Sequence, residues 1–477
     1  MTSRNDRSGE LRARAEAFGQ SHLFAFHARL SPAQREELVV DIERIDFEAI
    51  ANYFAAPDAA SDATVVDRIE PAEAWPAAPP PDRAADYRAA SAAGEALLRA
   101  GRVGAMTVAG GQGTRLGFDG PKGAYPISPV RNKPLFQLFA ESIVWARQRY
   151  RVSIPWYVMT SPTNDADTRA FFHANKFFGL DCDDVFFFEQ GVMPAMTLDG
   201  AILLDQKHRV ALAPDGHGGS LTALARSGAL RDMRERGIDT LSYFQVDNPL
   251  VKPFDPLFLG LHSRTKSQVS SLAIGKADDR ERVGNFARVD GRLCVIEYSD
   301  LPEALARART PEGRRRFDLG NIAVHLLDRA FLEDLTAPGG RLSLPWHRAV
   351  KKVPHVDRHT GQRIEPAQPN ALKLERFVFD ALPLAERTLL LLAERGEVFS
   401  PVKNAEGVDS AMTARRDMVR RAARWLDACG ASVPRRPDGE PDCTLEISPL
   451  LAADAASLRA KLPQGVSVAR GGVRYFE

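Results

Sequence analysis

Apolar positions follow two different periods along the chain. Between about residues 100 and 330, short apolar runs predict buried strands, among them RVGAMTVA, IPWYVMTS, DVFFFEQ and TLSYFQV. Stretches with helical spacing separate these runs, including one through AFFHANKFF and one from Ser220 to Arg236. Strands that alternate with helices are typical of a doubly wound α/β fold with a mostly parallel, Rossmann-like sheet. We therefore predict this fold class for the central part of the chain.

Two segments interrupt the alternation and predict antiparallel β-hairpins. The first is MTLDGAILLDQKHRVAL at 196–212, and the second is FARVDGRLCVIEYS at 286–299. In the second, Asp290 and Gly291 form the dipeptide that two-residue hairpin turns favour. Insertions of this kind are expected to shape a pocket beside the sheet.

The N-terminal part is predicted to be helical and to end in an extended connector. Ser31, followed by Pro32 and then by Gln34, has the spacing of a capping box at a helix start. Residues 70–83 contain five prolines, which remove backbone donors and favour extended chain. An alanine-rich helix over roughly 84–100 then ends at Gly101, as the glycine preference after helices predicts.

The pattern changes again after about residue 405. A basic helix is predicted over MTARRDMVRRAARWLDA, and its arginines are interpreted as a solvated face. A polar, glycine-rich end follows, which indicates a small α+β domain. The predicted organisation is a helical N-terminal domain with its proline-rich linker at 1–97, a catalytic domain at 98–404 and a C-terminal domain at 405–477.

Composition excludes several classes of protein. The 477 residues include 63 Lys and Arg against 62 Asp and Glu, and a net charge near +1 gives no reason to expect a nucleic-acid partner. The four cysteines are far apart and have no zinc spacing, which favours unpaired thiols in a reducing compartment. The longest apolar stretch, TLLLLAE, is much shorter than a membrane span, and the N-terminus has no apolar leader. We expect a cytoplasmic protein without a membrane partner.

The densest chemical signal is AGGQGTRLGFDGPKG at 109–123, which directly follows a predicted strand and contains six glycines. Glycine has no Cβ, so the backbone here can approach a phosphate or a base closely. Arg115 and Lys122 add positive charge where phosphates would lie. The spacing matches neither the GxGxxG dinucleotide motif nor the GxxxxGK[ST] phosphate loop, which argues against a nicotinamide enzyme or a P-loop ATPase. A glycine-rich loop with incidental charges is the alternative.

Further blocks in fixed order strengthen this signal. Together with the glycine-rich loop, they resemble the uridylyltransferases that make UDP-sugars, and the UDP-N-acetylhexosamine pyrophosphorylases in particular. The resemblance covers about residues 100–405. The blocks are EQGVMPAM at 189–196, APDGHGG at 213–219, YFQVDNPLVK at 243–252, VIEYSD at 295–300, GNIAVH at 320–325, PNALKLERFVFD at 369–380 and FSPVKN at 399–404.

The resemblance implies a nucleotidyltransferase fold and a reaction. A phosphate oxygen of a sugar-1-phosphate attacks the α-phosphorus of UTP, pyrophosphate leaves and a UDP-sugar forms, with Mg²⁺ required. Such a transfer needs positioning and charge neutralisation more than a protein nucleophile. The expected partners are UTP and the sugar-1-phosphate, and a monomer or a homodimer is expected.

The same resemblance implies roles for individual residues. Asp247, after the strand YFQV, is the predicted Mg²⁺ ligand, because Mg²⁺ prefers carboxylate oxygens. An isolated residue of each type would more often serve as a cap, an ion pair or part of the core. The predicted catalytic residues, which neutralise phosphate charge, are Arg115, Lys122 and Lys403; the predicted nucleotide-binding residues are Gly110, Gly111, Gly113, Thr114, Gln190, Gly216 and His217.

The resemblance implies that a third group of residues binds the sugar. Glu297 and Asn321 are the predicted specificity residues, because buried hydrogen-bonding groups select strongly for a matching substrate. Phe377 and Phe379 are predicted to wall the acetyl methyl, although core packing is an alternative for both. The full predicted group is Asn248, Gly284, Glu297, Tyr298, Asn321, Lys373, Phe377 and Phe379.

One difference from the family's usual sequence leaves the identity of the sugar substrate open. His217 stands where the N-acetylhexosamine members usually carry Asn, and GHG is closer to the UDP-glucose branch, whereas GNIAVH is closer to the N-acetylhexosamine branch. N-acetylglucosamine-1-phosphate is the preferred substrate in this interpretation. N-acetylgalactosamine-1-phosphate, glucose-1-phosphate and a broad range of sugars stay as alternatives. A catalytically silent nucleotide-binding scaffold is a more remote one.

Overall fold

A computed structural model describes residues 4–55, 68–340, 342 and 344–477 of the chain. The chain forms two compact units, and each contains several separate stretches of sequence. Unit 1 consists of Met1–Asp67, Gln190–Ala223 and Ser343–Ala381, and unit 2 of Arg68–Glu189, Leu224–Leu342 and Leu382–Glu477. The boundaries predicted at residues 98 and 405 both fall within unit 2, and they stay predictions.

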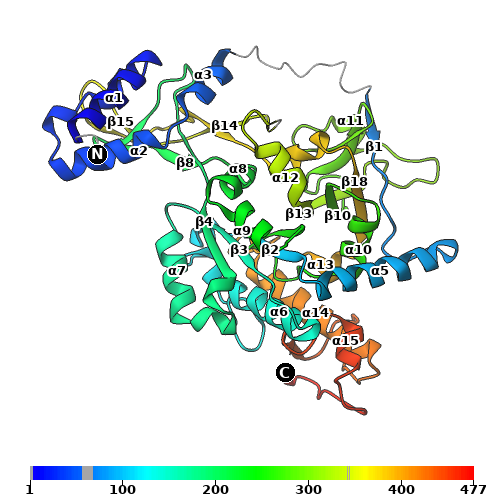
Figure 1. Cartoon of the computed structure of the whole chain (residues 1–477). Helices are drawn as coiled ribbons and strands as arrows, with labels where there is room; N and C mark the ends of the chain where they lie inside the picture. Colours follow the sequence, from blue (N-terminus) through cyan, green and yellow to red (C-terminus); the bar gives the residue numbers. More distant parts are fainter. Residues whose placement is uncertain (1–3, 56–67, 341, 343) are drawn as a thin grey trace. The chain divides into compact units, whose positions relative to one another are not determined.

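A mixed β-sheet forms the centre of unit 2 (Figure 1). Strands β9, β2, β3 and β4 are parallel neighbours, and β10 pairs with β18 in parallel. Strand β13 joins these two parallel parts because it is antiparallel to both β9 and β10. The ten strands found in the described residues are β1 (Ile69–Pro71), β2 (Val103–Val108), β3 (Trp156–Thr160), β4 (Val185–Glu189), β9 (Thr240–Gln245), β10 (Val269–Gly275), β11 (Asn285–Val289), β12 (Arg292–Ile296), β13 (Leu319–Asp328) and β18 (Thr388–Ala393).

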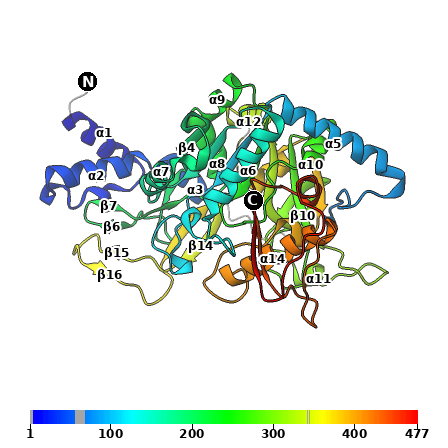
Figure 2. The same ribbon diagram turned by 90° about the horizontal axis from the view of Figure 1, so that it is seen from below.

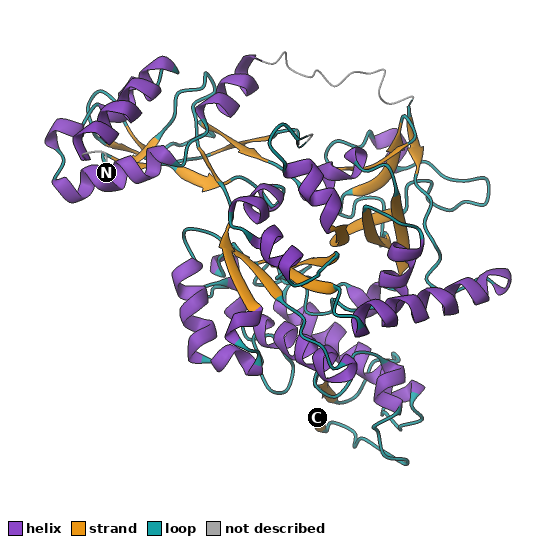
Figure 3. Ribbon diagram, in the orientation of Figure 1, coloured by secondary structure: helices purple, strands orange, loops and turns teal. Residues whose placement is uncertain are grey.

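Helices cover this sheet, as the buried strands require (Figure 3). Every residue of β2 and β3 is buried, which is the pattern of parallel strands with both faces covered. The predicted doubly wound α/β fold is therefore confirmed. The helices of this unit are α5 (Ala84–Arg99), α6 (Leu135–Tyr150), α7 (Asp165–Ala174), α9 (Ala229–Glu235), α10 (Pro256–Arg264), α11 (Glu303–Ala306), α12 (Arg329–Thr336), α13 (Arg395–Val398), α14 (Ala411–Ala428) and α15 (Ala455–Arg459), while α8 (Gly219–Arg226) crosses the boundary between the units.

The helix predicted from Ser220 to Arg236 is in fact two helices. Gly228 lies between α8 and α9 with a φ of 85°, a left-handed conformation that ends the first helix. The hairpin predicted at 286–299 is confirmed, since β11 and β12 are antiparallel and Asp290 and Gly291 both have positive φ. Strands β6 and β7 likewise form the hairpin predicted in 196–212.

Unit 1 combines helices with small antiparallel sheets. The capping box predicted at Ser31 is present: its hydroxyl accepts from the N–H of Gln34, whose side chain accepts from the N–H of Ser31. A buried core that includes Leu38, Ile42 and Met196 joins the helices to the strands. The elements are α1 (Arg4–Ala17), α2 (Pro32–Glu43), α3 (Phe47–Ala55), β5 (Val192–Pro194), β6 (Leu204–Gln206), β7 (Arg209–Val210), β8 (Leu212–Pro214), β14 (His347–Lys351), β15 (His355–Val356), β16 (Arg363–Ile364) and β17 (Ala371–Glu375).

The C-terminal segment packs around α14, with β19 (Thr444–Ile447) parallel to β20 (Val473–Phe476) (Figure 2). The interpretation of the arginines of α14 as a solvated face is wrong for several of them. Arg415 donates to the carbonyls of Pro126 and Ile127, and Arg421 donates to those of Leu250 and Glu397. Burial lowers the pKa of Arg421 to about 10. Periodicity alone does not show that a neighbouring segment covers this helix face.

The cysteines and the longest helices of the structure bear on two expectations from the sequence. The four cysteines all lie in the described part of the chain and form no disulfide with one another, as predicted. A helix that could cross a bilayer, which takes about 20 apolar residues, is not found among the described helices.

Candidate active site

Three parallel strands of unit 2 end side by side and create the candidate site. Val108 of β2 is opposite Met159 of β3 on one side and Gln245 of β9 on the other. The loops that follow these strands therefore leave the same edge of the sheet. In open α/β sheets, ligands bind at this carboxyl edge, where backbone donors are available. The glycine-rich loop follows the middle strand of the three.

The glycine-rich loop presents backbone donors. The N–H groups of Gly110, Gly111 and Gln112 have no acceptor among the described residues, whereas the N–H of Gly113 donates to the carbonyl of Gly120 at 2.9 Å. A Cβ on Gly111 would meet nothing within 4 Å, but one on Gly113 would lie 2.7 Å from the Phe118 ring. Gly110 and Gly111 therefore offer donors to a ligand, while Gly113 makes the tight turn of the loop possible.

Two buried residues that the sequence analysis missed hold this loop. The hydroxyl of Ser161 donates to the carbonyl of Gly110 at 2.9 Å, and the amide of Asn164 donates to the carbonyl of Ala109 at 2.9 Å. Both side chains are 1% exposed. Because they bind carbonyls, they fix the loop without using its N–H groups. Their position at the carboxyl end of the run IPWYVMTS, just after β3, was the available signal.

The loop also carries two cations without acidic partners. Among the described residues, Arg115 and Lys122 form no ion pair, although both lie on a protein rich in ion pairs. Arg115 and the neighbouring Thr114 are exposed, and Lys122 is half-buried. An ion pair on the surface, the alternative considered for Arg115, is therefore not observed. Free donors and unpaired positive charge together suit an anion.

Asp247 lies two residues after the end of β9 and is half-buried. Its carbonyl accepts from the N–H of Val402 at 2.8 Å. Asn248 beside it is 3% exposed; its amide donates to the carbonyl of Val398, and its Oδ1 accepts from the N–H of Ser400. Asn248 thus holds the 398–402 segment, and its predicted sugar contact stays a prediction.

The segment that Asn248 holds leads to Lys403. The Lys403 ammonium lies 3.8 Å from the carboxylate of Asp409, and the Lys403 N–H donates to the Asp409 carbonyl at 2.7 Å. Burial raises the pKa of Asp409, and the charge of Asp247 adds to this effect while Lys403 opposes it. Asp247, Lys403 and Asp409 are therefore close enough to influence one another. The sequence analysis did not single out Asp409, and no motif marks it.

The fit of these residues to a magnesium ion can be judged from their chemistry. Mg²⁺ is usually held by one or two carboxylates together with substrate phosphates. Asp247 and Asp409 supply two carboxylates that repel each other, which a divalent cation would relieve. The arrangement fits the ion. A separate cluster, Asp181, Cys182 and Asp183, is exposed and lies just before the start of β4, at the opposite edge of the sheet.

Three of the predicted sugar-binding residues lie together in unit 2. The N–H of Asn321 on β13 donates to the carbonyl of Gly284 at 2.8 Å. A Cβ on Gly284 would lie 3.3 Å from the carboxylate of Glu297 and 3.9 Å from the Cβ of Asn321. Since β13 runs antiparallel to β9, its first residues lie toward the edge where β9 ends. Tyr298, the next residue after Glu297, is 47% exposed.

The remaining predicted residues lie in unit 1. Strands β5 and β8 are antiparallel, with Val192 opposite Pro214, so Gln190 and Gly216 lie at matching ends of this pair. Gln190 is 8% exposed. Gly216 has a φ of 84°, and its Cβ would lie 2.3 Å from the carbonyl oxygen of Arg376. The fold therefore requires a glycine at position 216 whether or not a ligand binds there.

His217 belongs to an aromatic cluster in unit 1. Its ring stacks on Phe377 with a centroid distance of 5.1 Å, and Phe379 lies 5.7 Å away. Its Nδ1 accepts from the N–H of Val378, and burial lowers the pKa of His217 to about 4, so the ring is neutral near pH 7. His347, which the sequence analysis missed, stacks on the same Phe377 at 4.2 Å and binds Asp380. Lys373 lies on β17, opposite Ala349.

Comparisons with known proteins show the family to which the chain belongs. The family described as UTP–glucose-1-phosphate uridylyltransferase matches residues 48–424. Human UDP-N-acetylhexosamine pyrophosphorylase-like protein 1 is 37% identical over 95% of this chain and 94% of its own length. UDP-N-acetylglucosamine diphosphorylase 1 of Arabidopsis thaliana is 35% identical over 94% of this chain and 89% of its own. The solved structure of the Trypanosoma brucei uridine diphosphate N-acetylglucosamine pyrophosphorylase shows the same fold, with a TM-score of 0.81 and 24% identity over 98% of this chain and 99% of that one.

Proposed function

Because the chain belongs to the UTP–glucose-1-phosphate uridylyltransferase family, we propose that it forms UDP-N-acetylglucosamine and pyrophosphate from UTP and N-acetylglucosamine-1-phosphate. The names of two relatives, an N-acetylhexosamine pyrophosphorylase-like protein and an N-acetylglucosamine diphosphorylase, support this sugar. The single observation that carries the proposal is the glycine-rich loop. In the part of the chain that the structure describes, it presents three backbone donors without acceptors beside two cations without acidic partners.

The chemistry requires little more than positioning and neutralisation. The attacking oxygen belongs to a sugar phosphate that is already ionised near pH 7, so no general base is needed. The N–H groups of Gly110 and Gly111 bind nucleotide oxygens, and Arg115 and Lys122 oppose the charge that grows on the departing pyrophosphate. Lys403 approaches the reacting phosphates as a point charge, because Asn248 holds the segment that precedes it.

Asp247 is the proposed Mg²⁺ ligand, with Asp409 as a second carboxylate nearby. A bound Mg²⁺ neutralises phosphate charge and helps to orient UTP. Without a cation, the carboxylate of Asp247 would repel the same phosphates that Arg115 and Lys122 attract. The ion therefore makes an acidic residue compatible with an anionic substrate.

The sugar is recognised by hydrogen-bonding groups of the Gly284, Glu297 and Asn321 cluster. The absence of a Cβ at Gly284 leaves room for the Val295 side chain, which a Cβ would approach to 2.6 Å, and for the nearby carboxylate of Glu297. Gln190 and His217 in unit 1 stay the proposed nucleotide-binding residues, with Phe377 and Phe379 as proposed apolar walls for the acetyl group. A cytoplasmic monomer or homodimer completes the proposal.

The experiment that tests this function measures pyrophosphate release from UTP and Mg²⁺ with purified protein. N-acetylglucosamine-1-phosphate, N-acetylgalactosamine-1-phosphate and glucose-1-phosphate are supplied separately, and ATP replaces UTP in a control. We expect release to be fastest with N-acetylglucosamine-1-phosphate and absent with ATP. Faster release with glucose-1-phosphate would transfer the assignment to the UDP-glucose branch that His217 resembles. UTP binding without release for every sugar would instead support a silent scaffold.

A further inference from the structure

A hollow of unit 2 lies beside the predicted sugar-binding cluster. Its volume is about 570 Å³, which falls within the usual range for small-molecule sites. It is formed by the end of β10, the start of β11, the segment after β12 and helix α11. The residues that the argument uses are Lys276, Arg280, Asn285 and Tyr298.

Lys276 is a buried cation in the wall of this hollow. It is 6% exposed, and its ammonium donates to the Oδ1 of Asn285 at 2.8 Å. Within the described residues, no carboxylate lies within ion-pair distance of this ammonium. Burial lowers the pKa of Lys276, although acidic groups farther away oppose the effect. A buried charge that has one neutral partner is costly, and an anion in the hollow would remove much of that cost.

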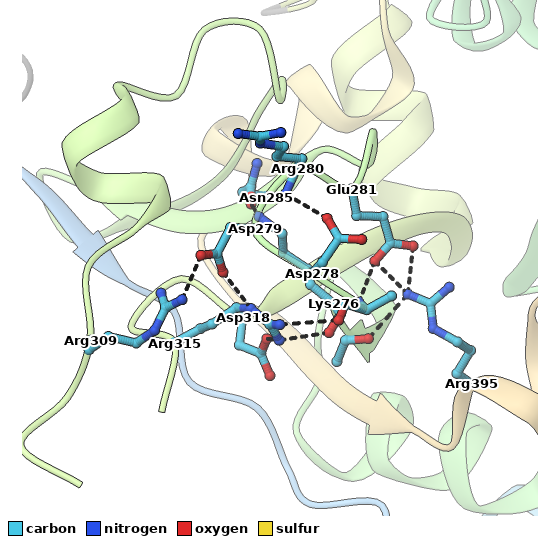
Figure 4. Close-up of polar contacts among 12 residues, drawn as sticks. Lys276, Asp278, Asp279, Arg280, Glu281, Asn285, Arg309, Arg315, Asp318 and Arg395 are labelled. Atoms are coloured by element: carbon cyan, nitrogen blue, oxygen red, sulfur yellow. Dashed lines mark hydrogen bonds and ion pairs between the residues drawn. The ribbon is translucent and has the colours of Figure 1, made fainter. Parts of the chain in front are cut away.

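Two carboxylates that line the hollow, Asp279 and Glu281, already bind arginines (Figure 4). Asp279 binds Arg309 at 2.5 Å and Arg315 at 2.7 Å, while Glu281 binds Arg395 at 2.6 Å. Both carboxylates therefore act on Lys276 only from beyond ion-pair distance. The side chain of Arg280, at the rim, is exposed and forms no ion pair among the described residues. Lys276 and Arg280 therefore bring positive charge to the hollow without an ion-pair partner in the described part of the chain.

The hollow also adjoins the predicted sugar contacts directly. Asn285, which holds Lys276, follows Gly284 in the chain and lies opposite Gly320 on β13. The next residue on β13 is Asn321, whose N–H binds the Gly284 carbonyl. Tyr298, which follows Glu297, lines the hollow itself. A substituent of a sugar that contacts Gly284, Glu297 and Asn321 can thus extend toward Lys276.

We propose that Lys276 is a specificity-determining residue and that the hollow takes a carboxylate carried by the sugar ring, so that the substrate range includes a uronic-acid form of the hexosamine-1-phosphate. The inference rests on the proposed function, because the carboxylate enters as part of the sugar substrate. A hydroxyl could accept a hydrogen bond from Lys276, but only an anion also compensates the buried charge. The reaction at the α-phosphorus is unchanged.

The experiment compares kcat/KM for two substrates that differ only at one carbon. These are N-acetylglucosamine-1-phosphate and the same sugar oxidised to the carboxylate at C6, each with UTP and Mg²⁺. Wild-type protein is expected to use the carboxylate substrate within about tenfold of the neutral one. The quantity scored is the ratio of the two kcat/KM values, because a general loss of folding or activity cancels in it.

Two variants change this ratio through different chemistry. Lys276→Met removes the charge, and Asn285→Asp keeps the hydrogen bond but gives Lys276 a permanent counterion. Each is expected to lower the ratio of carboxylate to neutral substrate by at least about tenfold, as expected for a lost buried ion pair. Lys352→Met, at an exposed lysine of unit 1 with no ion pair among the described residues, is the matched control and should leave the ratio unchanged.

The outcomes separate this inference from the proposed function. The inference about Lys276 would be overturned if the wild-type kcat/KM for the carboxylate substrate were more than about tenfold below that for the neutral substrate, a difference of about 1.4 kcal/mol. An unchanged ratio of the two kcat/KM values in both variants would overturn it as well. Equal losses for both substrates in Lys276→Met, with Asn285→Asp like wild type, would show a purely structural lysine. Failure of wild-type protein with every sugar-1-phosphate would instead refute the proposed function.

Discussion

Two glycine-rich segments of the molecule look alike in sequence but differ in what their glycines do. In the unit 2 loop, Gly111 has open space where a Cβ would be, and its N–H finds no acceptor among the residues that the structure describes. In unit 1, Gly216 has a positive φ, and its missing Cβ leaves room for the backbone of Arg376. The first segment is open toward a ligand, whereas the second is closed by its own fold.

The charges of the two regions differ in the same way. Arg115 and Lys122 beside the first segment have no ion-pair partner among the described residues. His217 in the second segment is neutral, accepts a hydrogen bond and lies between aromatic rings. A glycine-rich motif therefore indicates close approach, but the structure decides whether a ligand or another backbone approaches.

The largest effect on activity is expected when a cation of unit 2 is removed. Lys403→Ala should lower kcat by about 100- to 1000-fold, because a positive charge near the reacting phosphates acts mainly in the transition state. UTP affinity and the free energy of unfolding should change little, since the 3.8 Å contact with Asp409 is a weak, partly exposed ion pair. Steady-state kinetics and denaturant unfolding check both. Parallel losses of stability and turnover would make this lysine structural.

A pair of glycine substitutions tests most directly whether the two glycine-rich segments have different roles. Gly216→Ala should lower the free energy of unfolding by at least about 2 kcal/mol, because it combines positive φ with a backbone clash. Gly111→Ala should change that free energy by less than about 0.5 kcal/mol, yet weaken UTP binding about tenfold if the nucleotide approaches the loop. Denaturant unfolding and calorimetric UTP titration give the two values. Tight UTP binding by Gly111→Ala would mean that the loop is not the phosphate site.

The Mg²⁺ dependence of activity distinguishes two acidic sites of unit 2. Asp247→Asn keeps the shape of the side chain and removes its charge, so the Mg²⁺ concentration for half-maximal activity should rise about tenfold, the effect of losing one modest contact. Asp181→Asn, at the exposed acidic group, is the control and should leave the Mg²⁺ curve unchanged. A curve that does not move for Asp247→Asn would exclude this carboxylate from the metal site.

The smallest expected effect concerns pH in unit 1. The folded pKa of His217, about 4, is below the ordinary value near 6.5. The neutral ring therefore contributes its full stability above pH 6.5, and that contribution is lost as the pH falls toward 4. We expect His217→Asn, whose Oδ1 can replace Nδ1 as the acceptor, to reduce the loss of stability between pH 7 and pH 5 by about 2 kcal/mol.

A buried histidine of unit 2 provides a second test of how the stability depends on pH. Burial also lowers the pKa of His262 to about 4, so this histidine contributes with the same sign. His262→Asn should reduce the pH dependence of unfolding without any effect on the aromatic cluster. If His217→Asn leaves the pH dependence of unfolding as in wild type, the ring is exposed to water rather than buried.

Much of the fold follows from local pattern. The buried runs at 103–108 and 156–160 predict covered strands, and the Asp290–Gly291 turn predicts its hairpin, because neighbours in sequence determine both features. The broken helix at Gly228 was missed because a glycine inside a periodic stretch is often tolerated. The contacts of Arg415 and Arg421 were missed because the segments that cover α14 lie far away in sequence.

The sequence by itself determined the fold class, the glycine-rich loop and the family to which the chain belongs, since all three depend on residue type and order along one stretch. Tertiary structure alone decided that Ser161 and Asn164 hold the loop, that Asp409 lies near Asp247, and that Lys276 is buried against Asn285. Hydrogen bonds and charge interactions depend on distance in space and on exclusion of water. Strand pairing sets both, and it brings together residues that the sequence keeps apart.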